Sequence, residues 1–123
     1  MKIQILIFLA LFAIITTYGC NQPTETKATT IRLPHLVSPY NGSTNISIAP
    51  LFKWTNTAHK IQLSLFASFN TVVYSAEIGG NQYQMPSHVL QGGTTYYWRV
   101  GVISGNSFFW SAETYFFSTG VSE

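Results

Sequence analysis

The sequence has few charges and no aspartate. Only 8% of its 123 residues are charged, and six lysines and arginines stand against four glutamates. A net charge this close to zero gives little electrostatic attraction to a polyanion, and no basic patch with interleaved aromatic residues is present. We therefore expect no binding to nucleic acid, and a surface built mainly from serine, threonine, asparagine and glutamine.

Cysteine is almost absent as well. Cys20 is the only one, so the chain has neither a disulfide framework nor a C-x-x-C motif for metal or redox chemistry. The three histidines, His35, His59 and His88, form no short pair such as H-x-x-x-H, and the spacing does not indicate a zinc site. The sequence therefore predicts no metal and no cofactor.

Signatures of catalysis are also missing. No G-x-S-x-G motif marks a nucleophile. Paired carboxylates for glycoside hydrolysis would need two of the four glutamates to stand about 5 to 10 Å apart in a cleft, which a small domain rarely has. We therefore expect that the protein is not an enzyme.

The N-terminus contains the first pattern that indicates a function. Lys2 is followed by a run, residues 3–15, that is apolar except for Gln4. This run is shorter than the roughly 20 apolar residues that a membrane-spanning helix needs. A short apolar run after a positive charge is typical of a secretory signal. Residues 1–19 are therefore predicted to be a signal peptide.

The predicted signal ends at the only cysteine. The sequence TTYGC, residues 16–20, resembles a bacterial lipobox, in which the cysteine receives a diacylglycerol and becomes the mature N-terminus. Gly19 and Cys20 fit the pattern, whereas Thr17 replaces the usual leucine and Tyr18 is bulkier than usual. The resemblance implies an exported protein that lipid on Cys20 anchors to the bacterial cell envelope, at the cell surface, the outer membrane or the periplasmic leaflet. The alternative is an ordinary secretory signal cut near Gly19, which would leave a free thiol.

Residues 20–32 are predicted to be a flexible tether. The segment is polar and rich in threonine, and it has no hydrophobic period. A flexible coil of this length has a typical end-to-end distance of roughly 20 Å. A lipid on Cys20 would therefore hold the following domain just clear of the headgroups.

Residues 33–119 are predicted to form one all-β domain, with a short tail at residues 120–123. Runs rich in Val, Ile, Tyr, Phe and Trp alternate with turn signals that contain Gly, Asn, Ser and Pro, as expected for a β-sandwich. The expected strands cover residues 33–38, 50–55, 60–66, 72–78, 82–85, 95–103 and 113–119. No stretch has the period of about 3.6 residues that marks an amphipathic helix.

Alternation along the sixth expected strand separates core from surface. If Tyr96 points inward, Trp98 does so too, while Tyr97 and Arg99 point outward. The inward positions on the second and third strands are then Phe52, Trp54, Ile61, Leu63 and Leu65. The predicted aromatic core therefore consists of Phe52, Trp54, Tyr96 and Trp98.

The same strand carries a family resemblance. The sequence LQGGTTYYWRV is similar to the stretch that leads into the sixth strand of fibronectin type III domains, and PLFKW supplies a second-strand tryptophan, Trp54. The opening SPYNG and the closing WSAETYFFSTG resemble the variant common in bacterial surface lipoproteins. The resemblance implies an immunoglobulin-like, seven-stranded β-sandwich of fibronectin type III topology, in which the Tyr96 hydroxyl bonds back to nearby backbone.

That topology also implies an interaction face, because the third, sixth and seventh strands share a sheet. Their outward side chains are Gln62, Ser64, Tyr97, Arg99, Thr114 and Phe116. Since an arginine among exposed aromatic residues is common at hot spots, we expect a module for protein–protein interaction or scaffolding. A carbohydrate-binding accessory domain is the alternative function. Alternatively, Tyr97 and Phe116 form only a structural cross-strand pair, with Arg99 laid over a ring.

Overall fold

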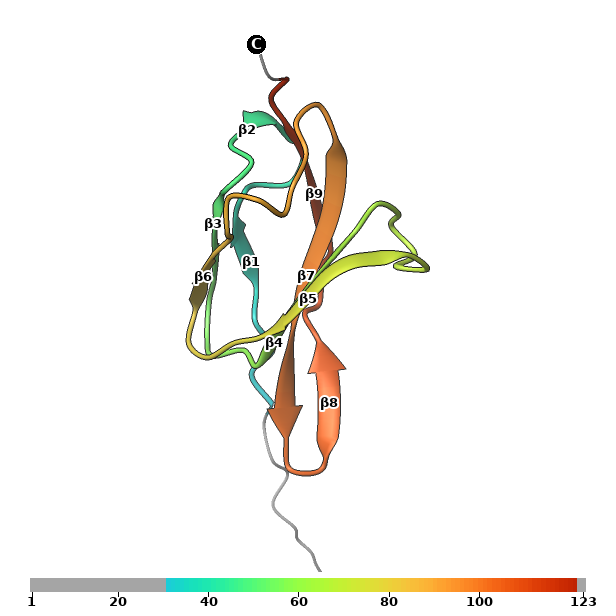
Figure 1. Ribbon diagram of the computed structural model, residues 1–123. Helices are drawn as coiled ribbons and strands as arrows, with labels where there is room; N and C mark the ends of the chain where they lie inside the picture. The colour runs from blue at the N-terminus through green and yellow to red at the C-terminus, as the bar shows by residue number, and fades with distance from the viewer. Residues whose placement is uncertain (1–30, 122–123) are drawn as a thin grey trace, which may run out of the picture. The chain divides into compact units, whose positions relative to one another are not determined.

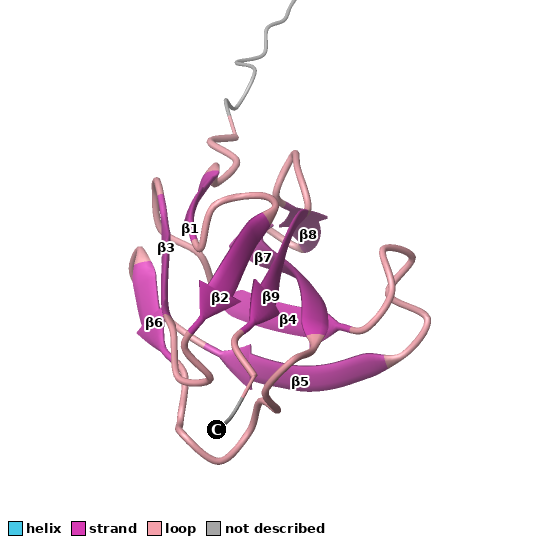
Figure 2. Ribbon diagram, turned by 90° about the horizontal axis from the view of Figure 1, so that it is seen from above, coloured by secondary structure: helices cyan, strands magenta, loops and turns pink. Residues whose placement is uncertain are grey.

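The computed structural model describes residues 31–121, which form an all-β fold without a helix. Two sheets face each other in a sandwich-like arrangement (Figures 1 and 2). The three-stranded sheet has the order β1 (Leu36–Ser38), β3 (Leu51–Trp54), β6 (Gln82–Gln84). The six-stranded sheet has the order β2 (Ser43–Ile46), β9 (Tyr115–Thr119), β7 (Thr95–Ser104), β4 (Lys60–Ser64), β5 (Val72–Glu77), with β8 (Ser107–Trp110) paired to β7.

The all-β prediction is confirmed, but the structure has nine strands where the sequence predicted seven. The additional strands are β2 and β8. Strand β2 has the polar sequence STNI and runs parallel to β9 at the edge of the sheet, so it has no apolar alternation to reveal it. Strand β8 pairs with the end of β7 through a tight turn in which Gly105 has a φ of 62°.

The core lies between the sheets and is built around Phe52 of β3 and Trp98 of β7. Both side chains are fully buried, and their rings meet edge to face with centroids 4.8 Å apart. Phe117 of β9 packs against Phe52 at 5.8 Å. Trp54 is 2% exposed, and its indole N–H donates to the Gly80 carbonyl at 3.1 Å. Contacts between two sheets therefore depend on a few large rings.

Tyr96 fixes the loop that precedes β7. Its ring is 4% exposed, and its hydroxyl accepts a hydrogen bond from the Gln91 backbone N–H at 2.9 Å. Leu90 of the same loop is 5% exposed. The loop is thus held to the core by apolar contacts and by hydrogen bonds, including one from the buried Thr119 hydroxyl to the Gln91 carbonyl at 2.6 Å.

Two residues at the end of β4 differ from prediction in their burial. Ser64 is opposite Tyr97 in a regular pairing with β7, so its side chain lies on the predicted outer side of the sheet, but the loop after β4 covers it. Ser64, expected on the surface, is fully buried, and its hydroxyl donates to the Thr71 carbonyl at 2.8 Å. Leu65, expected in the core, is 39% exposed.

A tyrosine pair joins the two sheets at their open side. Tyr74 lies on β5 and Tyr83 on β6, which are edge strands of different sheets, and their hydroxyls are hydrogen-bonded. Burial, the hydrogen bond to Tyr74 and the charge of Tyr74 raise the pKa of Tyr83 from 10.0 to about 12. The neutral form of this phenol is therefore the one that the folded state favours.

Removal of core rings should destabilise the domain strongly. Trp98→Ala is expected to lower the free energy of unfolding by about 3 to 5 kcal/mol, and Tyr96→Phe by about 1 to 3 kcal/mol because the Gln91 N–H loses its partner. Urea denaturation measures both changes. Tyr97→Phe, the same change on the outer side of β7, is the control and should cost about 0.5 kcal/mol or less. Equal stability of the Tyr96 and Tyr97 variants would contradict the assigned role of the Tyr96 hydroxyl.

The tyrosine pair predicts a loss of stability in alkali. A phenol whose pKa is higher in the folded than in the unfolded state stabilises fully below the unfolded value, about 10, and this contribution is lost as the pH rises through the folded value. For Tyr83 the window runs from pH 10.0 to about 12. Tyr83→Phe should flatten the decline of unfolding free energy in that window, measured by denaturation at successive pH values. Tyr40→Phe, at a side chain that is 67% exposed, should leave the decline in place.

Candidate interaction face

Aromatic side chains gather on the outer side of the six-stranded sheet. Register places Gln62 opposite Arg99, Tyr97 opposite Phe116, and Gly101 opposite Trp110. Side chains that are opposite in an antiparallel pair lie on the same face of the sheet. The outer aromatic face, as we define it, consists of Gln62, Phe69, Tyr97, Arg99, Phe108, Trp110 and Phe116.

Arg99 lies at the centre of the outer aromatic face. Its guanidinium carbon is 4.0 Å from the centroid of the Phe69 ring and 3.9 Å from that of Trp110. Its Nε and Nη2 donate to the Gln62 Oε1 at 3.2 and 2.9 Å. The arginine is therefore held by two rings and one amide, in contacts that are typical of cation–π pairs.

No carboxylate balances the charge of Arg99. Among residues 31–121 the one ion pair joins His35 and Glu113 at 3.5 Å. Partial burial lowers the pKa of the Arg99 guanidinium from its ordinary value, but arginine side chains are not deprotonated in proteins. The outer aromatic face thus carries one positive charge without an anionic neighbour.

Phe69 reaches this position from the loop between β4 and β5. Its φ is 60°, which is uncommon for a residue other than glycine, and its N–H donates to the Phe66 carbonyl at 3.0 Å. The ring is 8% exposed. Sequence reasoning missed Phe69, because a loop residue has no periodicity to indicate where its side chain goes.

Phe108 and Trp110 come from the hairpin that the sequence analysis did not predict. Their rings are 4.7 Å apart and nearly perpendicular, at 83°. Phe108 packs directly on the backbone of Gly101, where a Cβ would stand 2.1 Å from the ring. Only glycine allows this approach, so Gly101 is part of the reason that β8 lies flat along β7.

Tyr97 and Phe116 form the cross-strand pair that was the structural alternative for these residues. Their ring centroids are 5.6 Å apart, and the planes are tilted by 41°. Phe116 is 37% exposed. Arg99 stacks on Phe69 and Trp110 rather than on these two rings, so Tyr97 and Phe116 remain beside the arginine as a separate aromatic pair.

The other predicted site residues occupy different places. Ser64 lies on the outer side of the sheet opposite Tyr97 but is buried beneath the loop after β4, whereas Thr114 is exposed just before β9. The predicted core residues Phe52, Trp54, Tyr96 and Trp98 are all 4% exposed or less. Cys20, the predicted lipidation site, lies outside the described residues.

Residues 31–121 contain neither a candidate metal centre nor a candidate membrane-spanning helix. No three His, Cys, Asp or Glu side chains in this range gather closely enough to hold a metal ion. No helix in the same range is long and apolar enough to cross a bilayer. The outer aromatic face brings together four of the predicted interaction residues, Gln62, Tyr97, Arg99 and Phe116.

Comparison with known proteins adds no assignment to this geometry. No family model, no curated protein and no solved structure matches the chain. The function of the outer aromatic face must therefore be inferred from its own contacts.

Proposed function

We propose that this protein is a lipid-anchored cell-envelope protein whose fibronectin type III-like module binds a protein partner through the outer aromatic face. The observation that carries the proposal is Arg99, which is stacked between Phe69 and Trp110 and has no carboxylate within 4.0 Å in the described residues. Its surroundings include exposed Phe108 and Phe116. Arginine, tryptophan and tyrosine together are the residues most enriched at hot spots.

The rigid placement of Arg99 favours binding. A guanidinium has five N–H groups, and Arg99 uses its Nε and Nη2 on Gln62. The remaining donors can reach carboxylate or carbonyl oxygens of a partner. Since stacking and the Gln62 contact already fix the side chain, less conformational entropy is lost on association. A protein surface that presents an acidic side chain within an apolar patch has the complementary chemistry.

The ring arrangement favours a protein over a glycan. A sugar stacks best on an open, flat ring face, but one face of Trp110 is covered by Arg99 at 3.9 Å, and Phe108 stands perpendicular to it at 4.7 Å. Tyr97 and Phe116 are tilted by 41° and do not form one flat platform. Carbohydrate binding therefore remains the weaker alternative.

Strand order supports the fibronectin type III assignment. The strands that correspond to the expected third, sixth and seventh, namely β4, β7 and β9, are neighbours in one sheet. The other sheet has the order β1-β3-β6. The hydrogen bond from the Gln91 N–H to the Tyr96 hydroxyl is of the kind that the corner tyrosine of such domains makes.

The anchor is proposed from the sequence TTYGC, residues 16–20, which resembles a lipobox. The signal at residues 1–19 and the tether at residues 20–32 lie wholly or mostly outside the described range. A diacylglycerol supplies two acyl chains, and two chains are needed for stable anchoring. Binding through the outer aromatic face would then recruit the partner to the membrane surface.

The proposed anchor predicts that the phase into which the protein is extracted depends on Cys20. Cys20→Ser should move the protein from the detergent-rich phase to the aqueous phase of a two-phase extraction, because the substitution removes the only thiol that can carry lipid. Mass spectrometry of the wild-type N-terminal peptide should show the mass of the lipid on Cys20. An aqueous wild-type protein with an unmodified Cys20 would contradict the anchor.

The outer aromatic face predicts a binding defect at Arg99. Arg99→Lys keeps a positive charge but loses the planar stacking and the forked donors. For a partner captured by crosslinking on intact cells, the substitution should weaken binding by about tenfold or more, that is about 1.4 kcal/mol or more. Lys53→Ala, at an exposed position on the other sheet, is the control. Urea denaturation of both variants shows whether the fold is intact.

Two results would redirect this interpretation. Unchanged binding by the double variant Tyr97→Ala, Arg99→Ala, together with reduced stability, would make the outer aromatic face purely structural. Saturable retention of the protein on a polysaccharide column that Tyr97→Ala abolishes would instead establish the carbohydrate-binding alternative.

A further inference from the structure

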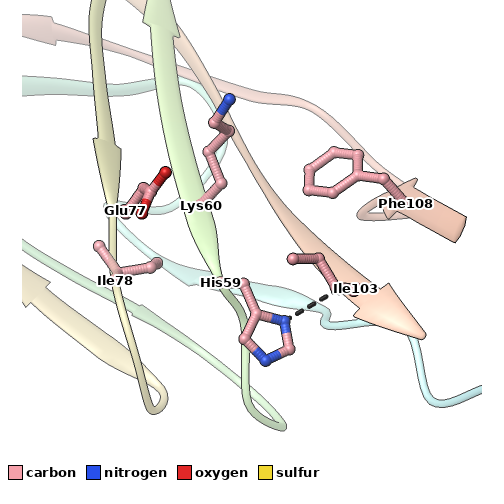
Figure 3. A pocket seen from close by; sticks show the side chains of 6 residues that line it. All are labelled: His59, Lys60, Glu77, Ile78, Ile103 and Phe108. Carbon is pink, nitrogen blue, oxygen red and sulfur yellow. Dashed lines mark hydrogen bonds between the residues drawn. The ribbon is translucent and has the colours of Figure 1, made fainter. Parts of the chain in front are cut away.

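A second surface lies at the end of the sandwich where the described chain enters the fold. A cleft of about 330 Å³ is lined there by His59, Lys60, Glu77, Ile78, Ile103 and Phe108 (Figure 3). We call it the end cleft. It contains three titratable and three apolar side chains, and the proposed partner binding through Arg99 does not use its polar groups.

The end cleft lies where three strands of the six-stranded sheet begin or end. His59 precedes β4, Ile78 follows β5, and Ile103 is one residue from the end of β7. This is the end from which residues 31–35 lead into β1 (Figure 1). Strand β9 runs to the opposite end, where Val121 is 74% exposed (Figure 1). Residues 31–35 therefore enter the fold at the end that carries the end cleft, away from Val121.

The polar groups of the end cleft are free to bind a ligand. The His59 Nδ1 accepts a hydrogen bond from the Ile103 backbone N–H at 2.9 Å, so neutral His59 carries its proton on Nε2 and offers it as a donor. Lys60 and Glu77 are register partners on β4 and β5. They nevertheless form no ion pair within 4.0 Å, since the one pair in residues 31–121 joins His35 and Glu113.

Apolar and charged groups are separated along the strands. Ile78 and Ile103 lie near the strand ends. The side chains of Lys60 and Glu77 extend away from these ends (Figure 3). Ile103 is 54% exposed and Phe108 is 40% exposed. Seen from the end where residues 31–35 enter the fold, the His59 ring comes first, Ile78 and Ile103 follow, and Lys60, Glu77 and Phe108 lie further in (Figure 3). The two isoleucines can therefore meet acyl carbons while Lys60 and Glu77 stay at the depth of the headgroups.

We infer that the end cleft binds the zwitterionic headgroup of a membrane phospholipid. The phosphate interacts with the Lys60 ammonium, the lipid ammonium interacts with Glu77, and Ile78 and Ile103 contact the first acyl carbons. One cation and one anion in the same cleft suit a headgroup that carries both charges better than one that is purely anionic.

The proposed anchor brings the end cleft close to membrane phospholipid. The inference rests on the proposed function in this respect, because lipid on Cys20 would hold the attached end of the domain within roughly 20 Å of the bilayer. Tethering of this kind converts a weak contact into an intramolecular one at high effective concentration. The domain would then stand with its end cleft on the membrane and the end that carries Val121 directed away from it.

The test uses a chain without covalent lipid, so that the anchor and the end cleft are examined separately. The Cys20→Ser protein is titrated with dihexanoyl phosphatidylethanolamine below its micelle concentration, and amide chemical shifts are followed by NMR. We expect saturable shifts at His59, Lys60, Glu77 and Ile103, with a Kd on the order of millimolar. Ile103→Ser, Lys60→Gln and Glu77→Gln should each weaken binding about threefold or more. Val121→Ser, the matched apolar change at the other end, should leave it unchanged.

Titrations with two further ligands show which parts of the lipid are recognised. Phosphoethanolamine alone should bind several times more weakly than the lipid, because it lacks the acyl carbons that Ile78 and Ile103 contact. Dihexanoyl phosphatidylglycerol should also bind more weakly, and Glu77→Gln should remove the difference between the two lipids. Absence of saturable shifts, shifts centred on Val121, or equal binding of both lipids to the wild-type end cleft would overturn the inference. An unmodified Cys20 in the wild-type protein would reject the anchor alone.

Discussion

The ten residues of β7 carry both the core and the proposed binding surface. Successive side chains of a strand point to opposite faces, so Tyr96 and Trp98 enter the core while Tyr97 and Arg99 stand on the outer aromatic face. Strand β7 also pairs with β4, β8 and β9. Every other element of the six-stranded sheet is positioned directly or indirectly by this strand, and a change in its register would exchange the two faces.

The two sides of β7 differ in how their polar groups are satisfied. On the core side, the Tyr96 hydroxyl accepts from the Gln91 N–H and fixes the preceding loop, while the buried Trp98 indole N–H has no hydrogen-bond partner among the described residues. On the outer side, Arg99 is held by Gln62 and two rings and still has unused donors. The core contacts therefore serve stability, whereas the outer contacts orient a charged group without neutralising it. That difference is the physical basis for assigning binding to the outer aromatic face.

Alternation predicted which side of the sheet the strand residues occupy, but not which of them the loops cover. Trp98 and Arg99 lie on the predicted sides of β7. Ser64 also lies on its predicted side, opposite Tyr97, but the loop after β4 bonds to its hydroxyl and buries it. Phe69 could not be found from sequence, since it reaches Arg99 from a loop with a positive φ. Phe108 and Trp110 were missed because β8 is only four residues long, SFFW, and directly follows a polar turn.

Gly101 connects these parts of the molecule in one further way. The Phe108 ring rests on its backbone, Trp110 packs against Phe108, and Arg99 stacks on Trp110. Residues in such a chain of contacts do not contribute independently, so the effects of substitutions along it will not add. The part of the outer aromatic face that runs from Phe108 through Trp110 to Arg99 is therefore one cooperative unit, and its assembly depends on the absence of a side chain at Gly101.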